Sequence, residues 1–242
     1  MPNLRLTRPH GLALAALTGL SLTGLALTSS AVAADANNPT VVELYQSQGC
    51  SSCPPANAVL NSIADRPDVL ALSFAVTYWD QLGWKDIFAH PAYTARQWEY
   101  SRAGGRTHVS TPQMIVNGRG VLVGSRKEQA EEYIKRFDRG ASGPSLAVAG
   151  DQVSIAKGAA RNPANVWLVR YDPRTHNVPI RAGENGGRTL PHKNIVREVH
   201  LLGKWSGDAA SFQMPGSKNN LLKSAVLVQD GPGGTILAAR RV

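Results

Sequence analysis

The chain has 242 residues, 26 lysines and arginines against 17 acidic residues, and only two cysteines. A chain of this length can bury a sizeable apolar core, which excludes a small protein held together by a disulfide framework. Its formal charge of +9 comes from scattered basic residues in runs of at most two, so no nucleic-acid partner is expected.

The first 34 residues have the pattern of a secretory signal peptide. Arg5 and Arg8 precede an apolar stretch at residues 12–27, and the small residues that follow predict cleavage near Ala33 or Ala34. An uncleaved anchor helix is the alternative, disfavoured by the Thr, Ser and Gly interruptions. We therefore expect a periplasmic or secreted protein with no stable membrane insertion after cleavage of residues 1–34.

The next segment predicts a strand, a helix and a second strand. Residues 40–46 are β-rich and mostly apolar, residues 56–64 have apolar side chains on one helical face, and residues 69–77 are again apolar. This order predicts a βαβ unit with parallel strands. Both cysteines, Cys50 and Cys53, fall on its strand-to-helix turn.

Residues 78–106 are aromatic and polar, with a predicted helix at 91–102. Their rings either pack on the sheet or line a substrate groove beside Cys50, and packing is the commoner role. Two short apolar strands then flank Asn117-Gly118, which is a strong hairpin signal. A helix at 125–137 follows, and Ser125 with Glu128 fits a capping box.

This order resembles a thioredoxin-like domain, with Thr111-Pro112 at the position of that superfamily's cis-proline. Five stretches are also similar to a secreted bacterial family, domain-of-unknown-function family 1223: residues 43–45, 49–55, 78–80, 110–113 and 183–185. The resemblance spans nearly the whole mature chain and brings no established activity. It implies an α/β thioredoxin-like domain at residues 35–140, with a central mixed sheet, a helical insertion and a cis-Pro loop.

A Gly/Ser/Pro segment at residues 139–144 predicts a domain boundary. Beyond it, short apolar runs between turns predict strands without a convincing helix, at residues 146–148, 152–155, 165–170, 195–202 and 224–229. We therefore expect residues 141–242 to form a small, mostly-β, sandwich-like domain.

Residues 183–188, with His192 and His200, form either a polar site or a turn beside ordinary surface histidines. We favour the turn, because Gly and Asn are typical turn residues. His176, His192 and His200 have no recognised metal-ligand spacing, so no metal ion or other cofactor is expected.

The position of the cysteines suits thiol exchange. A helix N-terminus favours a thiolate, so we predict Cys50 as the exposed nucleophile and Cys53 as the less accessible resolving thiol. The thioredoxin resemblance implies that Pro112 holds substrate beside the sulfurs and that Thr111 faces them. Gly49 and Pro54-Pro55 depart from thioredoxin itself, and Pro54 predicts that the helix begins one or two residues late.

The sequence thus predicts an exported thiol–disulfide oxidoreductase in which Cys50 and Cys53 cycle between dithiol and disulfide. Its expected substrates are proteins or small thiols. Two alternatives stay open: a non-catalytic envelope binding module with a structural or vestigial disulfide, and a copper-handling protein whose two thiolates hold a soft ion.

Overall fold

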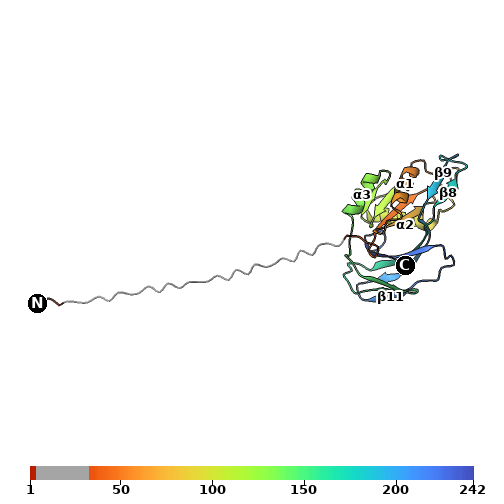
Figure 1. Cartoon of the computed structure of the whole chain (residues 1–242). Helices are drawn as coiled ribbons and strands as arrows, with labels where there is room; N and C mark the ends of the chain where they lie inside the picture. Colours follow the sequence, from red (N-terminus) through yellow and green to blue (C-terminus); the bar gives the residue numbers. More distant parts are fainter. Residues whose placement is uncertain (4–32) are drawn as a thin grey trace. The chain divides into compact units, whose positions relative to one another are not determined.

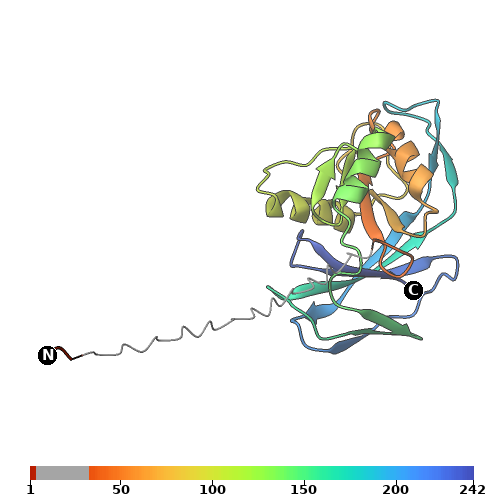
Figure 2. The same ribbon diagram turned by 60° about the vertical axis from the view of Figure 1, so that its left-hand side comes forward.

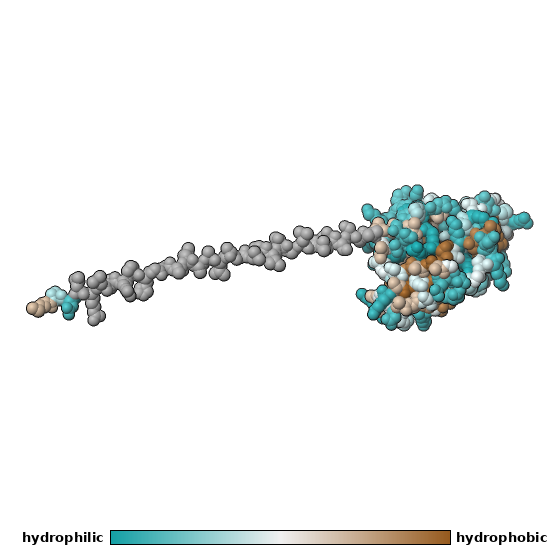
Figure 3. Space-filling model, turned by 60° about the horizontal axis from the view of Figure 1, so that its bottom comes forward, coloured by the Kyte–Doolittle hydropathy of each residue, from teal (hydrophilic) through white to brown (hydrophobic). Residues whose placement is uncertain are grey.

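The structure, a computed structural model, describes residues 1–3 and 33–242 (Figure 1). The predicted signal peptide lies almost entirely outside these residues. None of the helices in these residues could span a lipid bilayer. Figure 3 shows brown apolar areas set in a largely hydrophilic face.

The first part of the described chain forms the predicted βαβ unit. Strands β1 (Thr40–Gln46) and β2 (Val69–Ala75) are parallel and wholly buried, and helix α1 (Cys53–Ile63) connects them. Their near-continuous apolar sequences suit strands that are covered on both faces. Helix α2 (Pro91–Ala103) follows in the aromatic segment, as predicted.

Helix α1 begins at Cys53, so the predicted late start is wrong. Its prolines occupy the first helical turn, where the backbone N–H groups have no partner within the helix and a proline costs little. The first turn therefore carries the second cysteine directly.

The predicted hairpin is confirmed in strands β3 (Gln113–Val116) and β4 (Gly120–Leu122). Asn117 and Gly118 have φ angles of 46° and 68°, which match the left-handed turn that joins such strands. Helix α3 (Lys127–Arg136) follows, but its N-cap is Arg126 and no side chain caps it. The capping box predicted at Ser125 is therefore wrong.

Residues 141–242 contain nine strands, including those predicted. They are β5 (Leu146–Ala149), β6 (Gln152–Ile155), β7 (Ala164–Asp172), β8 (His176–Pro179), β9 (Thr189–His192), β10 (Ile195–Trp205), β11 (Ala210–Gln213), β12 (Lys223–Gln229) and β13 (Ile236–Arg241).

These strands do not form a separate sandwich. Strand β10 pairs in parallel with β2 at Ile195 and Ser73, which gives one eight-stranded mixed sheet in the order β13-β12-β7-β10-β2-β1-β3-β4. The expected boundary near residue 140 therefore separates two parts of one sheet, and Ala31–Val242 is a single compact unit. Pairing with β10 at this one position covers part of the edge of β2, an apolar strand whose backbone groups would otherwise be unpaired there.

Three layers pack on the large sheet (Figure 2). Helices α1 and α3, orange and green in Figures 1 and 2, lie side by side against β1 and β3. Helix α2 packs on the opposite face around Tyr45, Phe74 and Tyr100. The small sheet β11-β6-β5 packs against β7 and β12 through Val153, Leu168 and Val226.

The hairpin of β8 and β9 belongs to neither larger sheet. It lies beside α1 (Figures 1 and 2), where Asn61 Nδ2 donates to the carbonyl of Pro191 at 3.0 Å. Beneath it lies a small apolar cluster that includes Phe88, Val178 and Leu190. The hairpin thereby brings a distant part of the chain to the helix that carries the cysteines.

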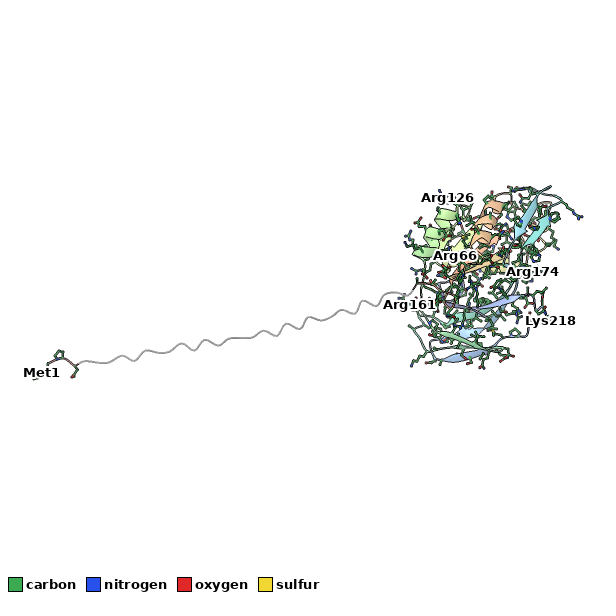
Figure 4. All side chains as sticks on the ribbon, in the orientation of Figure 1. Met1, Arg66, Arg126, Arg161, Arg174 and Lys218 are labelled. Atoms are coloured by element: carbon green, nitrogen blue, oxygen red, sulfur yellow. The ribbon has the colours of Figure 1, made fainter. Side chains whose placement is uncertain are left out.

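Figure 4 shows the labelled side chains at well-separated places on the folded body: Arg66, Arg126, Arg161, Arg174 and Lys218.

Candidate functional site

The cysteine turn follows directly from the end of β1. The carbonyl of Ser47 accepts a hydrogen bond from Cys50 N at 3.2 Å, and the carbonyl of Cys50 accepts one from Cys53 N at 3.1 Å. Since α1 begins at Cys53, both sulfurs lie where the strand ends and the helix starts. The predicted strand-to-helix setting is therefore confirmed.

Cys50 and Cys53 are free thiols, and both are buried, with 1% and 0% of their surface exposed. The prediction of an exposed Cys50 is therefore wrong. Ser51 and Ser52 occupy the outer part of the turn and are exposed, so the chain presents its serines to solvent and turns its sulfurs inward.

The two thiols have opposite acidities. The hydrogen bond from Cys53 lowers the pKa of Cys50 to about 6, against the opposing effect of burial, and the Thr111 side chain and the N–H groups of Ser52 and Cys53 contribute. Burial, followed by the neighbouring Cys50 thiolate, raises the pKa of Cys53 well above its usual range. At neutral pH, Cys50 is mainly a thiolate while Cys53 keeps its proton.

The loop at residues 110–113 completes the site beside Cys50. Cys50 Sγ lies 3.7 Å from the carbonyl oxygen of Thr111, and the Thr111-Pro112 peptide bond is cis. Gln97, buried on α2, supports this loop by donating to Ser110 O at 2.8 Å and Gln113 Oε1 at 2.9 Å. The structure therefore brings the four predicted site residues into one place.

Part of the aromatic segment packs on the sheet and two of its tryptophans lie beside the cysteine turn, while a substrate groove beside Cys50 stays a prediction. Trp79 Nε1 donates to the Thr111 hydroxyl at 2.7 Å, and Trp84 Nε1 donates to Gln48 Oε1 at 2.9 Å, so these two rings contact the site. Tyr93 and Tyr100 instead belong to the core under α2. The site thus has aromatic side chains on its border, while the rest of the segment packs on the sheet.

The loop between β8 and β9 also reaches the cysteine turn. Glu184 accepts the N–H of Ser51 at 3.0 Å, and Asn185 Nδ2 donates to the carbonyls of Gln48 and Cys50, both at 2.9 Å. The predicted turn between strands is therefore confirmed at residues 184–187, and this turn also contacts the cysteine turn, which was not predicted. The available signal was the presence of Gly183-Glu184-Asn185 among the motifs shared with the resembled family.

Of the two histidines predicted to lie on the surface, His200 is there with a side chain that is 42% exposed, whereas His192 is buried. His192 is 1% exposed, and burial lowers its pKa to about 4, so it is neutral at pH 7. His176 pairs with Asp172 at 2.8 Å and His200 with Glu198 at 3.0 Å. In the described part of the chain, no three His, Cys, Asp or Glu side chains are grouped as a metal site.

Comparisons with known proteins agree on the fold and name no reaction. The model of a family described as "Protein of unknown function (DUF1223)" matches residues 41–229. A crystal structure of protein AGR_C_4864 from Agrobacterium tumefaciens is 34% identical and superposes with a TM-score of 0.70, covering 86% of this chain and 94% of that one. No curated protein matches the sequence significantly.

A more distant structure, HBP35 of Porphyromonas gingivalis, is 12% identical with a TM-score of 0.57. It covers 85% of this chain and 75% of that chain. At this identity the likeness concerns the fold alone.

Proposed function

This chain belongs to the DUF1223 family of proteins of unknown function, and we propose from its cysteine turn that it is an exported thiol–disulfide oxidoreductase. One observation carries the proposal. Two thiols share a strand-to-helix turn, and their mutual hydrogen bond lowers the pKa of one to about 6 while burial raises the pKa of the other. A nucleophilic thiolate beside a protonated second thiol is what exchange chemistry requires.

A thioredoxin-like arrangement of the first half is part of this proposal. The order β1, α1, β2, α2, β3, β4 and α3, with the cysteines before α1 and the cis Thr111-Pro112 bond before β3, supports it. The remaining strands extend the sheet of that domain. The proposal assigns them no part in thiol exchange.

The exchange proceeds in two balanced steps. The Cys50 thiolate attacks one sulfur of a substrate disulfide, forming a mixed disulfide and releasing a substrate thiolate. Cys53 then passes its proton to the released thiolate, attacks Cys50 Sγ and frees the second half of the substrate as a thiolate, which takes a proton from solvent. Two electrons have moved from the protein dithiol to the substrate, and the reverse sequence oxidises a substrate dithiol.

The first step prepares the second. The Cys50 thiolate is one of the causes that raise the pKa of Cys53, and its charge disappears when the mixed disulfide forms. The resolving thiol therefore becomes easier to ionise only after substrate has been captured. Before capture, the negative charge on Cys50 favours the protonated form of Cys53, so the two sulfurs are not ionised at the same time.

One observation favours a second candidate, a binding module with a structural disulfide. Both cysteines are buried, and a buried sulfur is poorly accessible to a substrate. Under this alternative the pair forms a stable disulfide that does not exchange, and the protein acts through its other surfaces.

The pH dependence of Cys50 alkylation tests the proposal. With its pKa at about 6, the reduced protein should react with iodoacetamide at half its maximal rate near that pH, and the rate should be lost as the thiolate is protonated below it. Cys50→Ser, which keeps Cys53, should react negligibly across the same range. A midpoint at the ordinary cysteine value of about 8.5 would contradict the proposal.

A further inference from the structure

Asn185 connects the β8–β9 loop to the backbone of the cysteine turn. It is completely buried, although the other residues of 181–189 are exposed. Its two donated hydrogen bonds reach the carbonyls of Gln48 and Cys50, and its Oδ1 accepts from Arg188 Nη1 at 2.7 Å. Both N–H groups and the oxygen of this carboxamide are therefore engaged.

The same loop holds the turn at neighbouring points. Glu184 takes the N–H of Ser51, and Trp84, which donates to Gln48 Oε1, packs beside Gly183. Gly183 has a φ of +72°, and a Cβ there would lie 3.2 Å from Trp84 Cβ, so this close approach suits glycine. The loop thus meets the turn on both sides of Cys50.

We infer that Asn185 is a positioning residue for Cys50, because its two donated hydrogen bonds fix the backbone that orients the sulfur toward Cys53 and Thr111. This inference rests on the proposed function and adds a residue that is 135 positions away from Cys50 in the sequence. A carboxamide suits the task, because it can donate to two carbonyls at once without adding a charge beside the thiolate.

The groups that stabilise the Cys50 thiolate depend on this orientation. They are the Cys53 thiol, the Thr111 side chain and the N–H groups of Ser52 and Cys53. Since hydrogen bonds weaken steeply with distance and angle, a turn that has lost its fixed backbone loses part of this stabilisation.

Other ionisable groups also face the turn. Tyr78 has its pKa raised to about 12, mainly by burial and in part by both cysteines. Asp86 accepts the N–H of Gln48 at 2.8 Å, Glu184 accepts that of Ser51, and Arg188 bonds the far side of Asn185. Replacing Asn185 by an apolar residue directly removes only the contact with Arg188. The contacts of the other groups with the turn are kept.

The test compares the pH midpoint of iodoacetamide alkylation of Cys50 in folded full-length variants. Asn185→Ala and Asn185→Leu should raise the midpoint by about one pH unit, because the thiolate loses aligned donors. Arg188→Met is a surface change that removes only the hydrogen bond to Asn185 Oδ1, so it should shift the midpoint less, in the same direction. This variant also provides the test if the Asn185 variants fold poorly.

Asn61→Ala is the matched control. It removes a hydrogen bond from α1 to the same hairpin, at Pro191, without touching the cysteine turn, so its midpoint should equal that of the wild type. The inference is overturned if the folded Asn185 variants or Arg188→Met keep the wild-type midpoint, or if Asn61→Ala raises it equally. Exchange with oxidised glutathione is measured separately, so its absence in the wild type would overturn the proposed function and leave this comparison valid.

Discussion

Cys53→Ser should accumulate a mixed disulfide on Cys50 when it is incubated with oxidised glutathione. The Cys50 thiolate can still attack, but the serine that replaces Cys53 has no sulfur with which to release the captured thiol. Wild-type protein should instead pass through this adduct to its internal disulfide. Intact-mass spectrometry after acid quenching measures the adduct.

Cys50→Ser provides the control for this trap. Its remaining thiol is 0% exposed, and burial, the largest cause of its raised pKa, persists in this variant. At least about tenfold less adduct is therefore expected from it than from Cys53→Ser at neutral pH. Equal adduct in the two variants would show that the predicted division into nucleophile and resolving thiol is wrong.

Arg96→Met should destabilise the fold by about 3–5 kcal/mol, because it leaves the buried Glu43 without its ionic partner. The two side chains are 4% and 1% exposed and meet at 2.8 Å between Arg96 Nε and Glu43 Oε1. Arg96 also donates to Gln229 Oε1 at 3.0 Å and to the hydroxyl of Tyr100 at 3.1 Å, and that hydroxyl donates to Glu43. The pair therefore joins β1, α2 and β12 inside the core.

Urea unfolding at neutral pH measures this loss. Arg102→Met, on the exposed surface of the same helix, is the matched control and should change the free energy of unfolding by about 0.5 kcal/mol or less. A double variant, Glu43→Leu with Arg96→Met, should recover part of the loss, because no unpaired charge remains. An Arg96→Met protein as stable as the control would contradict the account of this network.

The first half of the fold was predictable because its signals are local. The apolar runs of β1 and β2, the Asn117-Gly118 turn and the helical segment after Pro91 are all read within a few residues. Strands β8 and β9 were missed because each has only four residues and includes a proline, which gives no strand pattern. The joining of the two halves was also missed, since the pairing of Ile195 with Ser73 depends on tertiary contact and leaves no local pattern.

The candidate site was likewise predicted only in part. Cys50 and Cys53 were identified from their spacing, and Thr111 and Pro112 from their resemblance to a known loop. The burial of Cys50 and the hydrogen bonds from Asn185 to the cysteine turn were not predicted. They depend on contacts between residues that are 61 and 135 positions apart in the sequence. A Gly-Glu-Asn segment read alone is a turn, and only its position beside the cysteines gives it another role.

Equilibration of the protein with glutathione buffers tests the central claim most directly, with the fraction of dithiol read by thiol-specific alkylation. A pair that exchanges should have a reduction potential between about −270 and −120 mV, the range of exchange-active dithiols. A pair that stays oxidised in every buffer, with a potential below about −300 mV, would be a structural disulfide and would contradict the oxidoreductase proposal.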